Sequence, residues 1–107
     1  MSFNVEVTDK FKRRAKILLK KYASLKQELE TFVISVKETP DQGTPIGKNC
    51  YKVRLGIKSK AKGKSAGARI ITHVHVYKST VYLLTIYDKS DQESISDKEI
   101  KELLNDI

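Results

Sequence analysis

The sequence of 107 residues has a single cysteine, no tryptophan and only two prolines. Because Cys50 has no second cysteine to pair with, the chain cannot be a small secreted domain held by internal disulfides. No apolar run approaches the length of a membrane span. Residues 1–9 alternate polar and apolar side chains and lack the apolar core of a signal peptide. These absences predict a cytoplasmic protein without a membrane partner.

Acidic residues are missing from a long internal stretch. Between Thr44 and Tyr87 there is neither Asp nor Glu, although the whole chain contains 13 acids and has a net charge of +8. The cations in this stretch are Lys48, Lys52, Arg54, Lys58, Lys60, Lys62, Lys64, Arg69 and Lys78. A short lysine run would indicate only a solvated loop. A stretch of one sign this long favours a partner that is a nucleic acid or an acidic protein.

The first forty residues carry one strand pattern and two helix patterns. Residues 2–7 alternate as in a strand, and Thr8 is placed to cap the helix that follows. The apolar side of this first helix is Phe11, Ala15, Leu18, Leu19 and Tyr22. Ser24 and Gln27 have the spacing of a capping box for a second helix. The apolar side of that helix is Leu25, Leu29, Phe32, Val33 and Val36. Their short connection predicts an antiparallel helical hairpin.

The rest of the chain is mainly β. Residues 49–57, 68–78 and 81–87 are predicted strands, and residues 58–67 are predicted to form a mobile lysine-rich loop. Ser96 and Glu99 form a second capping-box pattern that opens a short C-terminal helix. The element order is β-α-α-β-β-β-α in one domain spanning residues 1–107. This order predicts an α+β fold, in which the helical hairpin packs on one face of an antiparallel four-stranded sheet and leaves the other face uncovered.

Basic and aromatic side chains are predicted to meet on that uncovered face. Arg69 lies near the start of the predicted strand 68–78, on one face of it. Tyr87 and Lys89 lie where the last predicted strand ends. Lysine and arginine would hold RNA phosphates, and a tyrosine would stack on an unpaired base. The residues predicted to bind RNA around these three are Lys52, Arg54, His73 and His75.

Two other kinds of site receive less support from the residues. His73 and His75 form an H-x-H pair on one strand face, but a metal site needs a third ligand and acids nearby are few. We therefore expect no metal, although a histidine acid or base for RNA cleavage stays open. Cys50 is expected to be a small strand hydrophobe, since no base partner for a thiol nucleophile is visible.

A phosphate-binding loop is also excluded. Gly63, Lys64 and Ser65 are similar to the end of a Walker A motif, but Lys58 stands where that motif needs its first glycine. A strand, and not a helix, is predicted to follow, so the helix N-terminus that would bind the phosphate is missing. No nucleotide cofactor is expected.

Two segments carry specific motifs. Residues 58–71 (KSKAKGKSAGARII) contain a lysine-rich G-K-S-x-G-A-R segment that enters a strand, and residues 81–89 read VYLLTIYDK. In these segments the chain resembles RelE-like toxins of the HigB type. In that branch a hairpin leads to L-L-x-x-Y-x-K, then to an acidic stretch and a short S-x-x-E helix. Here those pieces are Leu83 to Lys89 and Ser96 to Glu99.

The resemblance implies the toxin of a type II toxin–antitoxin system. Such toxins cleave mRNA, generally in the decoding site of the ribosome beside 16S rRNA, without a metal or other cofactor, and a cognate antitoxin silences them. By position, the implied catalytic residues are Lys58, Lys60, Lys62, Lys64, Arg69, Tyr87 and Lys89. One loop lysine would be the base, Arg69 the phosphate clamp, and Tyr87 or Lys89 the acid.

Two other functions remain open at this point. A ParE-like poison of DNA gyrase would share the fold, and a non-catalytic RNA-binding or ribosome-binding module would need only the positive charge. The antitoxin is expected to carry an acidic segment that covers the basic face or displaces the C-terminal helix.

Overall fold

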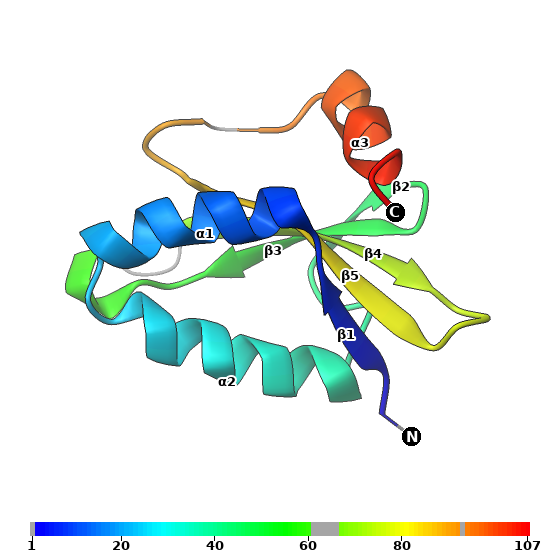
Figure 1. Cartoon of the computed structure of the whole chain (residues 1–107), viewed down its shortest axis with the longest axis horizontal. Helices are drawn as coiled ribbons and strands as arrows, with labels where there is room; N and C mark the ends of the chain where they lie inside the picture. The colour runs from blue at the N-terminus through cyan, green and yellow to red at the C-terminus, as the bar shows by residue number, and fades with distance from the viewer. Residues whose placement is uncertain (1, 61–66, 93) are drawn as a thin grey trace.

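The computed structural model describes residues 2–60, 67–92 and 94–107. Figure 1 shows a curved sheet with helices on both sides. Its elements are β1 (Asn4–Val7), α1 (Asp9–Lys21), α2 (Leu25–Glu38), β2 (Thr44–Gly47), β3 (Cys50–Leu55), a 3₁₀ turn η1 (Lys58–Lys60), β4 (Ala68–His75), β5 (Thr80–Asp88) and α3 (Asp97–Leu104). The α+β class and the order of the predicted elements are confirmed. None of the helices in the described ranges is long and apolar enough to cross a membrane.

The sheet has five strands in the order β1-β5-β4-β3-β2, and not the four predicted. The added strand, β2, pairs with β3 across a two-residue turn in which Lys48 and Asn49 both have positive φ, as tight hairpins require. Pro45 and Gly47 in this strand are residue types typical of loops, so the local sequence does not indicate a strand. The prediction of a wholly antiparallel sheet is also wrong, because β1 runs parallel to β5. The helical hairpin leads from β1 at one edge of the sheet to β2 at the other edge, and the chain returns through β3 and β4 to β5.

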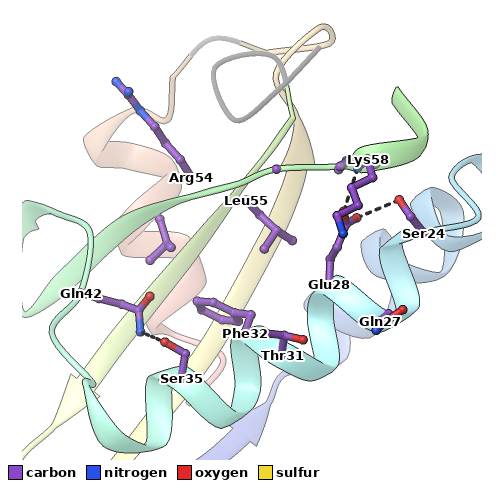
Figure 2. Close-up of a pocket in the computed structure, with 13 residues that line it drawn as sticks. Ser24, Gln27, Glu28, Thr31, Phe32, Ser35, Gln42, Arg54, Leu55 and Lys58 are labelled. Atoms are coloured by element: carbon purple, nitrogen blue, oxygen red, sulfur yellow. Dashed lines mark hydrogen bonds between the residues drawn. The ribbon is translucent and has the colours of Figure 1, made fainter. Parts of the chain in front are cut away.

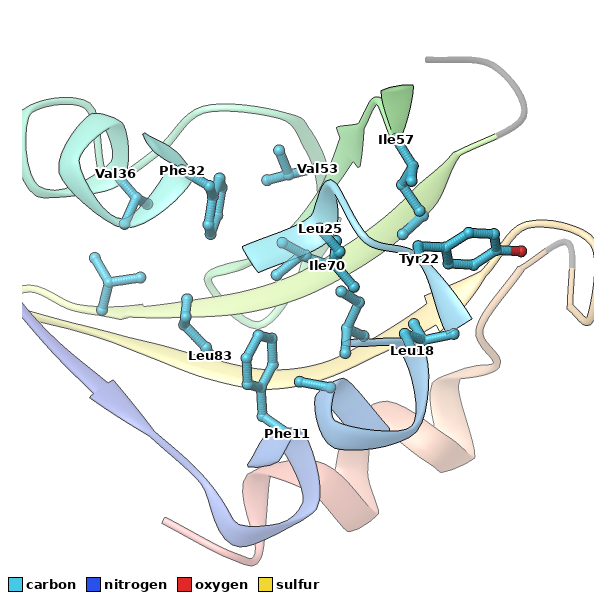
Figure 3. Packing of buried hydrophobic residues seen from close by; sticks show 14 of the residues in the cluster. Phe11, Leu18, Tyr22, Leu25, Phe32, Val36, Val53, Ile57, Ile70 and Leu83 are labelled. Carbon is cyan, nitrogen blue, oxygen red and sulfur yellow. The ribbon is translucent and has the colours of Figure 1, made fainter. Parts of the chain in front are cut away.

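The first face of the sheet is covered by α1 and α2. Figure 3 shows Phe11 and Leu18 of α1 and Phe32 of α2 packed over Ile70 and Leu83 of the central strands. Burying this apolar stripe is what holds both helices on the sheet.

Two details of the predicted helices are corrected and one is confirmed. The Thr8 hydroxyl does accept a hydrogen bond from the Phe11 amide, at 3.2 Å. Ser24, however, caps nothing, because its hydroxyl is bound to Glu28 and Ser59. Leu19, predicted to be part of the apolar side of α1, is 39% exposed.

The prediction that the second face of the sheet is left uncovered is wrong. Helix α3 packs there, with Ile100 and Leu103 buried against Ile71 and Leu84 of the sheet. The helix begins with the predicted Ser96–Glu99 capping box, in which each side chain binds the other residue's backbone amide. A short amphipathic helix this close to the sheet buries its apolar side there, so part of the second face is protected from solvent.

A bulge in β5 decides which face each residue near its end takes. Ile71 pairs with Thr85 and Thr72 pairs with Leu83, so Leu84 is an extra residue in β5. After this bulge, Tyr87 belongs to the cluster on the α3 side. The Asp88 carboxylate lies on the other side, bonded to Tyr22 at the end of α1.

Candidate functional site

Three predicted site residues form one row across three adjacent strands. Arg54 of β3 pairs with Arg69 of β4, and Arg69 pairs with Tyr87 of β5. Side chains that stand directly opposite each other in a sheet share a face, so the three lie side by side on the α3 side. Arg54 is exposed, whereas Arg69 and Tyr87 are only 3% and 4% exposed. We call this set the Arg54–Arg69–Tyr87 row.

The row contains one neutral hydroxyl beside permanent positive charge. Burial raises the pKa of Tyr87; the Arg69 charge partly opposes this rise, and Glu99 of α3 adds to it. Among the described residues, the phenol oxygen has no hydrogen-bond partner, although it is buried. Tyr87 therefore keeps its proton at neutral pH and has that proton free to donate.

Arg69 is held at the centre of the row by its own strand. Its Nη1 donates to the carbonyl oxygen of Ala68 at 3.1 Å. A guanidinium stays charged in any protein environment, so burial places a fixed positive charge under the second face. In Figure 2, the Arg54 side chain points to the side of β3 opposite Leu55 and Phe32.

Next to Tyr87 in the chain lies a carboxylate that sequence reasoning missed. Asp88 is fully buried and accepts hydrogen bonds from Tyr22 Oη and from Lys60 Nζ, each at 2.5 Å, and from the Ser90 amide at 2.9 Å. Burial alone would raise the pKa of Asp88, but these bonds hold it well below its usual range. The only signal in the sequence was its position, as the first acid after the acid-free stretch.

Of the predicted lysines within the described ranges, Lys58 and Lys60 do not lie at the row. Lys60 is bound to Asp88 and to the Ser90 hydroxyl. Lys58 is on the side of α2, where its amide donates to Glu28 at 2.7 Å (Figure 2). Lys62 and Lys64 lie outside the described residues. Lys89 directly follows β5, and its amide donates to the Gly67 carbonyl at 3.0 Å.

The remaining predicted RNA-binding residues continue along the same face. Lys52 pairs with Ile71, two residues along β3 and β4 from the arginine pair, and Cys50 pairs with His73. His75 lies at the far end of β4, where its Nδ1 accepts a bond from the Lys78 amide at 3.3 Å. Lys52, His73 and His75 therefore share the face of the row, as predicted, but they lie progressively further along the strands and do not converge on it.

Cys50 and His73 approach each other, which sequence reasoning did not foresee. The Cys50 Sγ lies 3.7 Å from His73 Nδ1. Burial raises the pKa of the Cys50 thiol to about 11, and the positive charge of Lys48 only partly opposes the rise. Burial also lowers the pKa of His73. Both groups are neutral at pH 7, so the thiol is not activated as a nucleophile. No cluster of three His, Cys, Asp or Glu side chains suited to a metal occurs within the described ranges.

Two hollows lie beside the sheet. A groove of about 610 Å³ runs between α2 and β3, lined by Phe32, Leu55 and Lys58 among others (Figure 2). Arg54 is also among its lining residues. A smaller hollow of about 160 Å³ lies between α1 and the end of β5, where Arg14 and Ile17 meet Tyr87 and Asp88. Each hollow therefore reaches one member of the row, Arg54 in the groove and Tyr87 in the smaller hollow.

Comparison with solved structures identifies the fold of this chain. No family model matches the sequence. A double-arginine mutant of the E. coli toxin RelE in the free state superposes with a TM-score of 0.65 at 19% identity, over 95% of this chain and 98% of RelE. The isolated E. coli RelE toxin superposes at 0.58 and 16% identity, over 99% and 100% of the two chains. A RelE mutant in complex with an antitoxin RelBc peptide gives 0.59 and 18%, over 95% and 94%. The strands and helices of this chain are therefore arranged in the fold of RelE.

Proposed function

We propose that this chain is the toxin of a type II toxin–antitoxin system and acts as a cytoplasmic endoribonuclease, cleaving mRNA on the ribosome without a metal. Its fold is that of RelE, which is described as a toxin and has been solved both with an antitoxin peptide and as an intact toxin–antitoxin complex. Fold alone does not assign chemistry, so the proposal depends on the site.

The observation that carries the proposal is the Arg54–Arg69–Tyr87 row. It places two guanidinium groups beside a protonated phenol on one sheet face, within a stretch that contains no acid. Guanidinium groups bind phosphate oxygens, and fixed positive charge stabilises the charge that develops on a phosphorus undergoing attack. Such a row suits the cleavage of an RNA phosphodiester better than the binding of an acidic or apolar small molecule.

The reaction that fits is attack by the ribose 2′-hydroxyl. A base takes the 2′-OH proton as the 2′ oxygen bonds to phosphorus, and the bond from phosphorus to the 5′ oxygen of the next nucleotide breaks. Arg69 stabilises the negative charge on the phosphoryl oxygens. Tyr87, kept neutral by its raised pKa, gives its proton to the departing 5′ oxygen. The products are a 2′,3′-cyclic phosphate and a free 5′-hydroxyl.

The base in this proposal is one of the predicted lysines, and the contacts of Lys58 and Lys60 support a choice among the others. The Lys60 ammonium group is bound to the buried Asp88 carboxylate and to the Ser90 hydroxyl, and it does not lie at the row. Lys58 lies on the α2 side of the sheet. The base proposed here is therefore Lys62, Lys64 or Lys89.

Access to the row requires α3 to move. Tyr87 is buried against Ile100 and Leu103 of α3, so RNA cannot touch its hydroxyl while the helix stays in place. An antitoxin with an acidic segment would bind the exposed cations of the basic face, or take the place of α3. The second candidate function, an RNA-binding module without catalysis, is favoured by this same burial.

A cell-free translation assay with a defined message separates these functions. New 5′ ends are mapped by primer extension with wild type, with Arg69→Ala, and with Lys37→Ala on the outer side of α2 as the control. We expect ribosome-dependent cleavage that falls at least about 100-fold in Arg69→Ala and is unchanged in Lys37→Ala. Blocked translation of an intact message would indicate a ribosome binder. An intact, normally translated message would overturn the proposal, and a supercoiling assay would then test the gyrase alternative.

A further inference from the structure

Helix α1 has a charge pattern that its place in the fold does not explain. Apart from Asp9 at its start, every charged residue of the helix is a cation. These cations are Lys10, Lys12, Arg13, Arg14, Lys16, Lys20 and Lys21. They lie outside the acid-free stretch and outside the Arg54–Arg69–Tyr87 row, so the proposed cleavage chemistry does not use them.

This pattern works against the helix itself. Lys12 and Lys16 are like charges at i,i+4, and so are Lys16 and Lys20, and such pairs destabilise a helix. Lys10 and Lys12 stand in the first turn, where the helix dipole disfavours positive charge. Among the described residues, only Lys21 of this helix is within salt-bridge distance of an acid, at 3.8 Å from Asp88. Charge arranged this unfavourably indicates a polyanion that is absent from the isolated chain.

The cations form a surface separate from the buried side of the helix. Phe11, Ala15 and Leu18 face the sheet and are buried. The residues on the outside are Lys12, Arg13, Lys16 and Lys20, all exposed, and we call these four the α1 cation face. With a rise of about 1.5 Å per residue, the face extends over roughly 12 Å of helix. It offers several cations to a run of phosphates at once.

The helix also borders the candidate site. Arg14 and Ile17 of α1 line the hollow of about 160 Å³ that contains Tyr87 and Asp88. Of the two acids in that hollow, Asp88 is neutralised by Lys60, and only Asp91 is exposed. Figure 1 shows α1 on the outside of the molecule, beside the segment that leads from β5 to α3. An RNA bound at the row would therefore find further positive charge on this helix.

We propose that the α1 cation face binds the phosphate backbone of RNA, as a second contact surface distinct from the residues of cleavage. The proposal extends the RNA-directed function proposed above but does not need cleavage. Backbone recognition requires only positive charge in a suitable spacing, and specifies no sequence. An acidic protein would also need apolar anchors for a tight interface, and the exposed part of α1 offers only Ile17 and Leu19, at 60% and 39% exposure, among seven cations.

The test is RNA binding by the whole chain, measured separately from catalysis. Wild type and the triple variant Arg13→Gln/Lys16→Gln/Lys20→Gln are titrated into a labelled 2′-O-methyl RNA, which cannot be cleaved because it lacks the attacking hydroxyl. We expect the slope of log affinity against log salt to fall by about 2, since each single-strand phosphate contact contributes roughly 0.7. At low salt, affinity should drop at least about tenfold. Glutamine is a good helix former, and removing the repulsion should leave the thermal midpoint unchanged or higher.

The matched control is Lys26→Gln/Lys37→Gln/Lys78→Gln, which removes the same three positive charges from the net +8 at exposed positions elsewhere. Its salt slope should stay close to wild type. Equal losses in both triple variants would show that only net charge matters and would overturn the proposal. So would poly-glutamate that competes as well as RNA per unit charge, because the face would then fit an acidic protein. A chain that binds through α1 but never cuts a message would overturn the nuclease function and leave this surface standing.

Discussion

Tyr87 and Asp88 are neighbours in the chain, but they lie in opposite environments. The Asp88 carboxylate is buried among donors from α1, η1 and the turn after β5, and both of its oxygens are bonded. The Tyr87 hydroxyl is equally buried, and within the described residues nothing bonds to it. One peptide bond and the alternation of a strand separate a fully satisfied polar group from an unsatisfied one.

The difference separates a structural role from a functional one. A buried carboxylate with every oxygen paired stabilises the fold and has no capacity left for a ligand. A buried hydroxyl without a partner costs stability, and a ligand or a reaction that uses it is one explanation for its presence. Arg69 lies beside Tyr87 and not beside Asp88, so the unsatisfied hydroxyl is also the one next to a fixed cation.

The largest effect on stability is expected from substituting Asp88, the residue with the structural role. Asp88→Asn removes the charge that Lys60 and Tyr22 bind in a buried setting, and should lower the free energy of unfolding by about 3 kcal/mol. Urea unfolding followed by circular dichroism measures it. The control is Asp91→Asn, an exposed carboxylate close by, which should change stability by less than about 0.5 kcal/mol. Equal effects of the two variants would contradict the structural role of Asp88.

The pH dependence of stability should follow from the same carboxylate. Because the folded pKa of Asp88 lies below its unfolded value, its contribution is fully present above about pH 4 and is lost as pH falls toward the folded pKa. Wild type and Asp88→Asn should therefore differ most at pH 5–7 and converge in more acidic solution. Unfolding curves at several pH values measure this. A difference that grows on acidification would have the wrong sign for this account.

Part of the fold and of the candidate site could be predicted from the sequence, because the patterns that indicate it lie within single helices and strands. The alternation of residues in 68–78 and 81–87, the helical spacing of Phe11, Ala15 and Leu18, and the Ser96–Glu99 cap each lie within one element. Strand alternation placed Arg69 on the same face as His73 and His75. The prediction that Tyr87 joins that face is correct only because the bulge at Leu84 shifts the register.

The rest depends on contacts between distant parts of the chain. No local pattern says that β1 will dock parallel to β5, or that α3 will cover the second face. The Ser24 hydroxyl does not form the predicted helix cap and is instead hydrogen-bonded to Ser59, 35 residues away in the chain. Lys60 was grouped with the other lysines because its sequence neighbours are basic, whereas its partner, Asp88, lies 28 residues further on. Sequence reasoning therefore found the charge of the site and missed which charges are already paired.

The most direct test of the central claim is Tyr87→Phe, measured for stability and for cleavage in the same preparations. Removing a buried hydroxyl that has no partner should leave the free energy of unfolding within about 1 kcal/mol of wild type, or raise it. Loss of the proton donor should slow cleavage of a defined message at least about 100-fold. That pairing of an intact fold with lost cleavage is the predicted result. A Tyr87→Phe protein that cuts RNA at the wild-type rate would contradict the account.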